Sequence, residues 1–455
     1  MRNLLFAIIF LPVLSIAQKT YVPDDAFEQK LIDMGYDDIL DDSVITSHID
    51  TVTELDISFS NIQDCDGIKD FIALTYLNCA RNTITSLDLS GCTALTKLFC
   101  YSNELSSLDL SGYTALTVLF CSSNNLTSLD LSDCSALDSL VCRRNDLTSL
   151  DLSDCTALTI LDCGSNELTS LNLSNCIALN YLSCTKNDLV NLDLSDCTSL
   201  TSLDCLNNKL TSLDLSDCIA LNYLKCEGNA LTSLDLSDCA ALTDLECSFN
   251  ELTSLDLSDF TALTTLTCYE NVLTSLDLSD CINLISLVCD NNALTTLDLS
   301  DCITLLHLHC QENALTSLDL SDCNALIYLR CESNSLECLN LKNCDYNSLI
   351  LKAKDNYTLF CIDVDDSAFC TNNFKTAVDS WTRFSEDCGN LGINENALEK
   401  SIIVYPNPNN GSFRIKESFK KPSEMSIFIT NTLGIVVYKG FDGSVNQTLS
   451  GYNFL

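Results

Sequence analysis

An asparagine recurs every 21 residues from Asn61 to Asn334, 14 times in all, and the residues around it recur with it. Residues 116–136 read LTVLFCSSNNLTSLDLSDCSA, in which the leucines, a cysteine and the asparagine hold fixed places. A unit this short cannot bury its own leucines, so it must stack on its neighbours. The period therefore predicts a solenoid in which residues 53–345 form one repeat array.

Side chains alternate in direction along the two extended stretches of each coil. In one representative coil, the residues expected to face the core are Leu95, Leu98, Cys100, Leu105, Leu108 and Leu110. Asn103 is expected to turn inward at the bend, where its amide can donate to and accept from backbone groups. Stacked coils would form parallel β-sheets on two faces of a mainly β solenoid, with about 13 rungs in each sheet.

Twenty-four of the 29 cysteines fall on two ladders of the repeat. One ladder runs from Cys79 to Cys331, and the other runs from Cys92 to Cys344 with Tyr113 and Phe260 in two of its places. In-register neighbours would lie about 4.8 Å apart, whereas a disulfide prefers roughly 3.8 Å between Cβ atoms. We therefore expect buried thiols. A chain of disulfides or a thiolate metal site is the alternative.

The residues before the array indicate export and capping. Residues 1–17, MRNLLFAIIFLPVLSIA, resemble a secretory signal, because a charged start precedes a short apolar run and small residues. That run is too short to span a bilayer comfortably, and no other stretch approaches about 20 apolar residues, so no transmembrane segment is expected. In residues 18–52, an N-cap at Asp24 or Asp25, apolar Phe27 and Leu31, and Gly35 as a stop predict a helix that closes the first coil.

The residues after the array are expected to form a C-terminal cap at 346–390, a linker at 391–400 and a separate domain at 401–455. Cys361, Cys370 and Cys388 lie in the cap, off both ladders. A cap without a regular core gains most from one cross-link, and we expect it between Cys361 and Cys388.

The formal net charge of −40 disfavours nucleic acid and anionic membranes as partners. Aspartates form a row from Asp88 to Asp319, broken only by Asn172, and a second row begins at Asp133. Neighbouring carboxylates about 5 Å apart repel. Nearby serines, water and diffuse counter-ions could offset this repulsion. Alternatively, the row could bind Ca²⁺, or a regular mineral or ice surface. The candidate calcium ligands are Asp109, Asp130, Asp151, Asp193, Asp214 and Asp235.

The outward positions of the first stretch differ from coil to coil, whereas the second stretch hardly varies. The candidate ligand-binding residues are Lys97, Phe99, Tyr101, Phe120, Arg143, Tyr181, Tyr223, Lys225, Tyr269, His307, His309, Tyr328 and Arg330. Aromatic and arginine side chains carry much of the energy in binding hot spots, so this face is predicted to bind a ligand. Drift on an unconstrained surface is the alternative.

Chemistry beyond binding is not expected. His307 and His309 lack a good third metal ligand on the neighbouring rungs, so we interpret them as an exposed pair. The chain has no glycine-rich phosphate loop and no nucleophile motif. Identical aspartate environments cannot separate two pKa values for acid–base work, and we therefore expect no enzyme.

The repeat Leu-x-x-Leu-x-Cys-x-x-Asn-x-Leu-x-x-Leu-Asp-Leu resembles leucine-rich repeats, specifically the 21-residue IRREKO type of bacteria. The resemblance covers about residues 53–345. It implies binding to other macromolecules, usually through the sheet that carries the asparagine motif.

At the other end, Tyr405-Pro406-Asn407-Pro408, Gly411 and Phe413, followed by SIFITNTLGIVVYKG, resemble the C-terminal sorting domain of type IX secretion in Bacteroidetes. The resemblance implies a small β-sandwich, passage through the outer-membrane secretion machinery, and then release or surface attachment. Such domains usually end with one more strand and basic residues. This chain stops at Leu455, and the domain is therefore expected to be truncated.

Together these patterns predict a secreted or cell-surface binding protein that recognises a protein or a glycan through its variable face. The alternative is a structural or adhesive protein that uses its aspartate rows. No cofactor is expected other than possible Ca²⁺.

Overall fold

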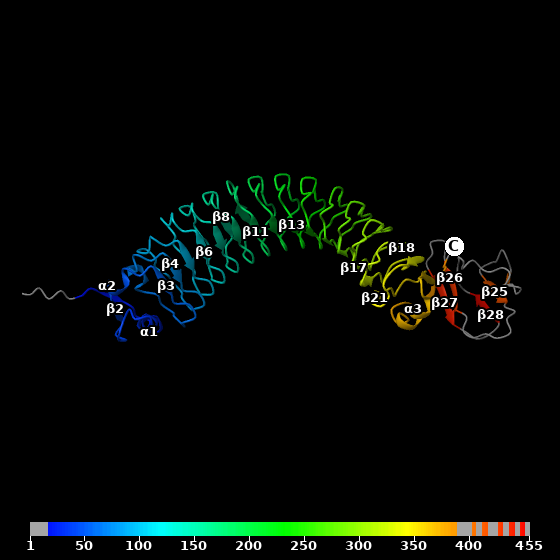
Figure 1. The fold of residues 1–455 in the computed structure, drawn as a ribbon, viewed down its shortest axis with the longest axis horizontal. Helices are drawn as coiled ribbons and strands as arrows, with labels where there is room; N and C mark the ends of the chain where they lie inside the picture. The colour runs from blue at the N-terminus through cyan, green and yellow to red at the C-terminus, as the bar shows by residue number, and fades with distance from the viewer. Residues whose placement is uncertain are drawn as a thin grey trace, which may run out of the picture. The chain divides into compact units, whose positions relative to one another are not determined.

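The structure, a computed structural model, describes residues 17–388 and the backbone of five strands between residues 403 and 450. Contacts divide the chain into two units, residues 1–386 and 387–455. The first unit is a curved solenoid (Figure 1), and a sheet of 15 short parallel strands lines the inner side of its arc. We call this sheet the inner sheet.

The inner sheet has one strand from each coil. Its strands are β3 (Glu54–Asp56), β4 (Tyr76–Asn78), β5 (Lys97–Phe99), β6 (Val118–Phe120), β7 (Ser139–Val141), β9 (Ile160–Asp162), β11 (Tyr181–Ser183), β12 (Ser202–Asp204), β13 (Tyr223–Lys225), β14 (Asp244–Glu246), β15 (Thr265–Thr267), β16 (Ser286–Val288), β17 (His307–His309), β19 (Tyr328–Arg330) and β21 (Ile350–Lys352).

Equivalent leucines stand next to each other in this sheet. Leu98 pairs with Leu119 one coil later, and both are fully buried. The two cysteine ladders lie in the same core as buried free thiols, as the sequence predicts. Burial raises the pKa of the Cys121 thiol to about 12, so the ladder is protonated at neutral pH. The solenoid core is therefore a stack of leucines and uncharged thiols.

The asparagine ladder satisfies the backbone of the bends. Asn145 donates its amide to the carbonyls of Cys121 (3.1 Å) and Cys142 (2.9 Å), and its Oδ1 accepts from the Leu126 N–H (3.0 Å). The same three-bond pattern runs from Asn82 to Asn356. This confirms the structural role expected of the ladder.

The first member of the sequence pattern, Asn61, is not part of this ladder. Leu55 pairs with Leu77, so the first coil has 22 residues, and Ser60 takes the ladder place. The Ser60 N–H donates to the Oδ1 of Asn82 at 3.0 Å. Asn61 is exposed with a φ of 60°, which asparagine tolerates better than most residues.

The second sheet is mostly absent from the described part of the solenoid. Strands on this face occur only as the pair β8 (Ser149–Asp151) and β10 (Ser170–Asn172), and as the group β18 (Ser317–Asp319), β20 (Cys338–Asn340), β22 (Cys361–Asp363) and β23 (Arg383–Ser385). The prediction of about 13 rungs per sheet was therefore wrong for this face. Curvature is one reason, because rungs on the outside of an arc are farther apart than on the inside (Figure 1).

Side-chain burial agrees with looser packing on this outer face. Leu108 of the outer stretch retains 7% of its exposure, whereas Leu98 of the inner sheet retains none. The leucines of the outer stretch nevertheless face the core, as expected.

The N-terminal cap contains β1 (Lys19–Tyr21), α1 (Asp25–Asp33), β2 (Ser43–Ile45) and α2 (Thr46–Ile49). The 3-10 helix η1 (Ile68–Asp70) follows in the first coil, between β3 and β4. Asp24 caps α1, accepting from the N–H groups of Ala26 and Phe27 at 2.9 Å each. Phe27 and Leu31 are fully buried, and Gly35 follows the helix with a φ of 81°. These features confirm the predicted capping helix.

The C-terminal cap follows β21 and contains β22, α3 (Ser367–Asn373) and β23. Asp366 caps α3 by accepting from the Phe369 N–H at 2.8 Å. Cys361 and Cys388, the two residues expected to be cross-linked, are both disulfide-bonded, whereas Cys370 is a free thiol.

In the second unit, β24 (Ile403–Tyr405), β25 (Ser412–Lys416) and β28 (Asn446–Ser450) form one antiparallel sheet. β26 (Ser426–Thr430) and β27 (Val436–Phe441) form another. Residues 1–16 of the expected signal, the expected linker, the Pro-Asn-Pro turn and the chain end after Ser450 lie outside the described residues. No helix among the described residues is both long and apolar enough to cross a membrane.

Candidate binding surface

All 13 candidate ligand-binding residues lie on the outward face of the inner sheet, in three columns. The first column contains Lys97, Tyr181, Tyr223, His307 and Tyr328, the second Phe99, Phe120, Lys225, His309 and Arg330, and the third Tyr101, Arg143 and Tyr269. Pairing in register places each residue beside its equivalent on the next coil. The columns therefore form one continuous surface along the inside of the arc.

Aromatic rings pack against each other at the N-terminal end of this surface. The ring centroids of Tyr76 and Phe99 are 5.5 Å apart, and those of Phe99 and Phe120 are 5.1 Å apart with near-perpendicular planes. These are favourable aromatic geometries, and they hold three rings in fixed positions across three coils. Tyr76 was not among the sequence candidates, although it occupies the same column as Lys97.

An arginine lies between two aromatic rings beside this row. The Arg81 guanidinium carbon is 4.8 Å from the centroid of Phe59 and 5.9 Å from that of Tyr101. Phe59 is 67% exposed, so its ring is available to a ligand. Phe59 and Arg81 were missed because they follow the strand in the left-handed region, with φ of 53° and 56°, outside the period-two alternation. The available signal was the residue directly before each ladder position, which is a non-glycine in every described coil except at Gly228.

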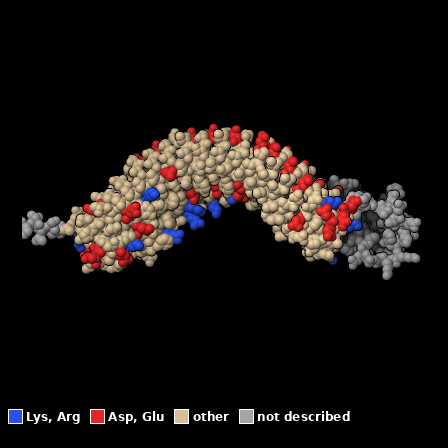
Figure 2. All heavy atoms as spheres, viewed as in Figure 1, with Lys and Arg blue, Asp and Glu red and all other residues tan. Residues whose placement is uncertain are grey.

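We refer to Phe59, Tyr76, Arg81, Phe99, Tyr101 and Phe120 as the aromatic patch. Basic residues continue the surface beyond it, with Lys97 exposed in the first column and Arg143 and Arg144 two coils later. Arg143 lies 3.6 Å from Asp162. In Figure 2 lysine and arginine atoms gather on the inner side of the arc, although the chain as a whole carries a net charge of −40.

Ion pairs within the sheet occupy the middle of the surface. Lys225 lies 2.6 Å from Glu246 and 3.3 Å from Glu227. Burial opposes ionisation and raises the pKa of both Asp204 and Glu227. Because Lys225 already pairs with two glutamates of its own sheet, its charge is largely neutralised within the sheet.

Near the C-terminal end, His309 and Tyr328 have ring centroids 5.1 Å apart, and Lys352 Nζ is 5.8 Å from the Tyr328 centroid. Burial, helped by the nearby Arg330 charge, lowers the pKa of His309. Arg330 Nε lies 3.5 Å from Glu332. Neither histidine belongs to a group of three possible metal ligands among the described residues.

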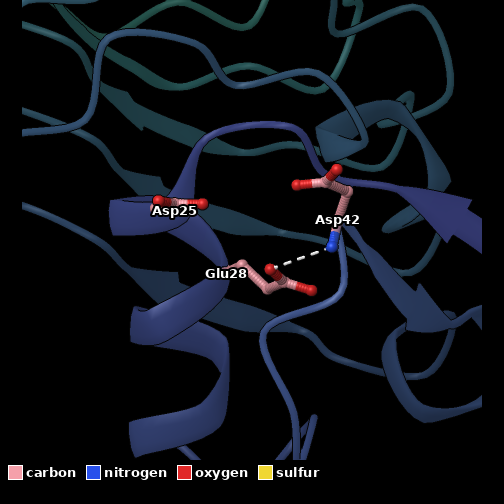
Figure 3. Close-up of side chains that lie close together, drawn as sticks. All are labelled: Asp25, Glu28 and Asp42. Carbon is pink, nitrogen blue, oxygen red and sulfur yellow. Dashed lines mark hydrogen bonds between the residues drawn. The ribbon is translucent and has the colours of Figure 1, made fainter.

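The group of possible metal ligands in the described residues is instead Asp25, Glu28 and Asp42. The buried Glu28 carboxylate accepts backbone N–H groups from Asp41 (3.0 Å), Asp42 (3.2 Å) and Ser43 (2.9 Å). Figure 3 shows it directed at the backbone nitrogen of Asp42. Hydrogen bonds to the loop before β2 therefore account for this buried carboxylate.

The first aspartate row lies on the outer side of the arc, where acidic atoms follow one another along the rim (Figure 2). Asp109 Oδ1 accepts from the Ser111 N–H at 3.0 Å and from its hydroxyl at 2.6 Å. The backbone bond recurs at Asp130, Asp151, Asp193, Asp214 and Asp235. These bonds lower the pKa of the row carboxyl groups. None of the six expected calcium ligands joins a group of three among the described residues.

The C-terminal unit matches a known family. Residues 403–453 match the model of the secretion system C-terminal sorting domain. The chain is accordingly a secreted or outer-surface protein, as predicted. No curated protein sequence matches the chain.

Solved structures match the solenoid. The functional domain of InlJ from Listeria monocytogenes, which includes a cysteine ladder, is 29% identical with a TM-score of 0.66, and the match covers 93% of this chain and 98% of that one. An internalin, inlF, from the same species is 24% identical with a TM-score of 0.60 (70% and 96% covered). A leucine-rich repeat protein from Leptospira interrogans is 19% identical with a TM-score of 0.54 (75% and 97% covered). The fold is a leucine-rich repeat solenoid.

Proposed function

We propose that this secreted or surface protein binds a protein ligand on its inner sheet and that the aromatic patch is the main contact. The single observation that carries the proposal is the packed set of rings around Arg81 on an exposed, rigid sheet. Rigid aromatic side chains and arginine lose little entropy on binding, which is why they dominate hot spots.

The unpaired positive charges in and beside the aromatic patch favour a ligand that has acidic groups next to apolar ones. Arg81, Lys97 and Arg144 are exposed in or beside the patch, and no ion pair within residues 17–388 involves any of them. A protein surface offers carboxylates and apolar side chains together, whereas a neutral glycan offers no charge for these cations. We therefore favour a protein over a neutral glycan.

The test compares capture by the full chain with capture by two double variants. R81A/F99A removes the centre of the aromatic patch. F249A/Y269A removes a ring pair of the same kind, with centroids 4.9 Å apart, farther along the same surface. Proteins captured by the parent chain from host or environmental extracts are identified by mass spectrometry, and the affinity of a purified partner is then measured.

We expect R81A/F99A to weaken a specific partner at least tenfold, since truncated hot spots cost about 2 kcal/mol or more. F249A/Y269A should retain the affinity. Equal losses in both variants, or binding of neutral glycans alone, would contradict the assignment. The alternative, adhesion through aspartate rows that bind Ca²⁺ or a regular surface, stays a prediction, as does the absence of enzymatic activity.

A further inference from the structure

A cavity of about 530 Å³ lies in the C-terminal cap, away from the aromatic patch. It is formed by the end of α3, the segment from Lys375 to Thr382, the start of β23 and the side chain of Lys354 after β21. Pockets that hold small ligands measure roughly 300–1,000 Å³, so the volume is sufficient for one. The cap thus offers a concave site that the repeat pattern alone does not create.

The cavity is positively charged within a very acidic chain. Lys354, Lys375 and Arg383 line it, and no ion pair within residues 17–388 involves any of the three. The one lining carboxylate, Asp379, accepts the Asn356 N–H at 3.0 Å. Three cations and one carboxylate give a local charge of +2 against −40 for the chain. Convergent cations without partners favour an anionic ligand.

Hydroxyl groups and an aromatic wall complete the lining. The hydroxyls of Thr376 and Ser380 make no hydrogen bond with the described part of the chain, so both are available to a ligand. Trp381 lines the cavity and stacks on Tyr357, with ring centroids 6.1 Å apart and planes 26° apart. That contact holds the indole in a fixed orientation. A charged ligand ring with an apolar face and several hydroxyls would contact the cations, the threonine and serine hydroxyls and the indole of Trp381.

We propose that this cavity binds an anionic sugar, a saccharide unit with a carboxylate or sulfate group. Lys375 and Arg383 contact the charged group, Thr376 and Ser380 bond to ring hydroxyls, and the ring lies against Trp381. A bare inorganic anion would leave the wall and the hydroxyls unused. This site goes beyond the proposed binding of a protein by the inner sheet and does not depend on it.

The test is calorimetric titration of the full chain with four probes. These are a galacturonate disaccharide, a sulfated disaccharide, a neutral disaccharide and inorganic sulfate. The variants are Lys375→Gln and Arg383→Gln, whose side chains are exposed and make no ion pair within the described residues, so the fold should be retained. Lys342→Gln is the matched control, because Lys342 is a cation of the same region, 3.6 Å from Asp363, that does not line the cavity.

We expect at least one charged disaccharide to bind, the neutral one to bind at least tenfold more weakly, and affinity to fall as salt rises. Each cavity variant should lose about tenfold, as expected when a hydrogen bond to a charged group is removed, and Lys342→Gln should bind normally. Whether carboxylate, sulfate or both are accepted identifies the source of the charge. The proposal is overturned if no charged sugar binds, if the neutral sugar or inorganic sulfate binds equally well, or if Lys342→Gln loses as much as the cavity variants.

Discussion

Asn172 donates a hydrogen bond of 2.8 Å from its amide to the Asp151 carboxylate, and these two residues end the paired strands β10 and β8. Every other strand pair of the outer face also places a carboxylate beside a neutral residue, Asp319 beside Asn340, Asn340 beside Asp363, and Asp363 beside Ser385. Where two aspartates adjoin, no strand pair forms among the described residues. A neutral neighbour is not sufficient for pairing, because no strand forms at Asp193 beside Asn172. The absence of any Asp–Asp strand pair in the described part of the chain nevertheless indicates that charge repulsion joins curvature in keeping this face open.

The substitution Asn172→Asp restores an unbroken aspartate row and removes the hydrogen bond. We expect it to lower the free energy of unfolding by about 0.5–1 kcal/mol at low salt, since like charges on adjacent strands are destabilising. Urea unfolding at about 10 mM and about 500 mM salt measures this, and the difference should shrink at high salt. If the variant is as stable as the parent chain at low salt, charge repulsion does not contribute to keeping the outer face open.

The asparagine ladder should tolerate no apolar replacement. Asn208 is nine-tenths buried, donates to the carbonyls of Cys184 and Cys205 at 3.1 Å each, and accepts from the Leu189 N–H at 3.2 Å. Asn208→Leu leaves these backbone groups buried and unpaired, and should cost about 2–4 kcal/mol. Thermal unfolding measures the loss. Asn222→Ser, at an exposed site off the ladder, is the control and should unfold like the parent chain.

Thiol reactivity should separate one cysteine from the rest. Of the 27 free cysteines only Cys338 is exposed, and burial raises the pKa of ladder thiols such as Cys121 to about 12. A thiol reagent should therefore modify one group per folded chain and 27 per unfolded chain under non-reducing conditions. In Cys338→Ser the folded count should fall to zero. A folded count of several would mean that the ladders are accessible or oxidised.

Acid should destabilise the solenoid through the first aspartate row. Serine N–H and hydroxyl groups lower the pKa of row carboxyls such as Asp109 and Asp214 below the ordinary 3.8. A carboxyl with a lowered pKa in the folded state contributes stability above its unfolded pKa, and that contribution is lost as pH falls through the folded value. The melting temperature should thus decrease from about pH 4 downward. A rise in this range would indicate that repulsion outweighs the serine bonds.

Calcium should not change the stability. The row carboxylates already accept hydrogen bonds from serines, and no three of them converge within the described residues. We expect the same melting temperature in excess chelator and in about 5 mM Ca²⁺, because a ligand stabilises only if it binds the folded state preferentially. An increase of several degrees with Ca²⁺ would instead favour the cation-binding alternative.

The inward residues could be predicted because the same residue types recur at the same positions in all 13 coils. Leu98, Cys100 and Asn103 hold positions that a two-residue alternation and a satisfied backbone require. The open outer face could not be predicted, because it depends on the curvature of the whole stack and on neighbours such as Asp151 and Asn172. The shift of the ladder from Asn61 to Ser60 arises because the first coil has 22 residues. A search at a fixed period of 21 residues selects Asn61 and so misses this shift.

The candidate surface was predicted as a face but not as a set of contacts. Phe99 and Tyr101 follow from alternation, whereas the position of Arg81 between Phe59 and Tyr101 joins residues from three coils. The cavity beside Trp381 was missed for a similar reason. The cavity lies in the cap, where no repeat relates one residue to another. Lys354 and Arg383 line the same cavity only because of the three-dimensional fold.

The buried cysteine ladders set an order of events for an exported chain. Once coils have stacked, 26 of the free thiols are out of reach, but before that each one can meet an oxidant or another thiol. Neighbouring ladder members lie 21 residues apart in sequence, a loop that closes readily in an unfolded chain. Correct maturation therefore requires that the coils fold and stack faster than oxidation forms non-native disulfides between ladder cysteines.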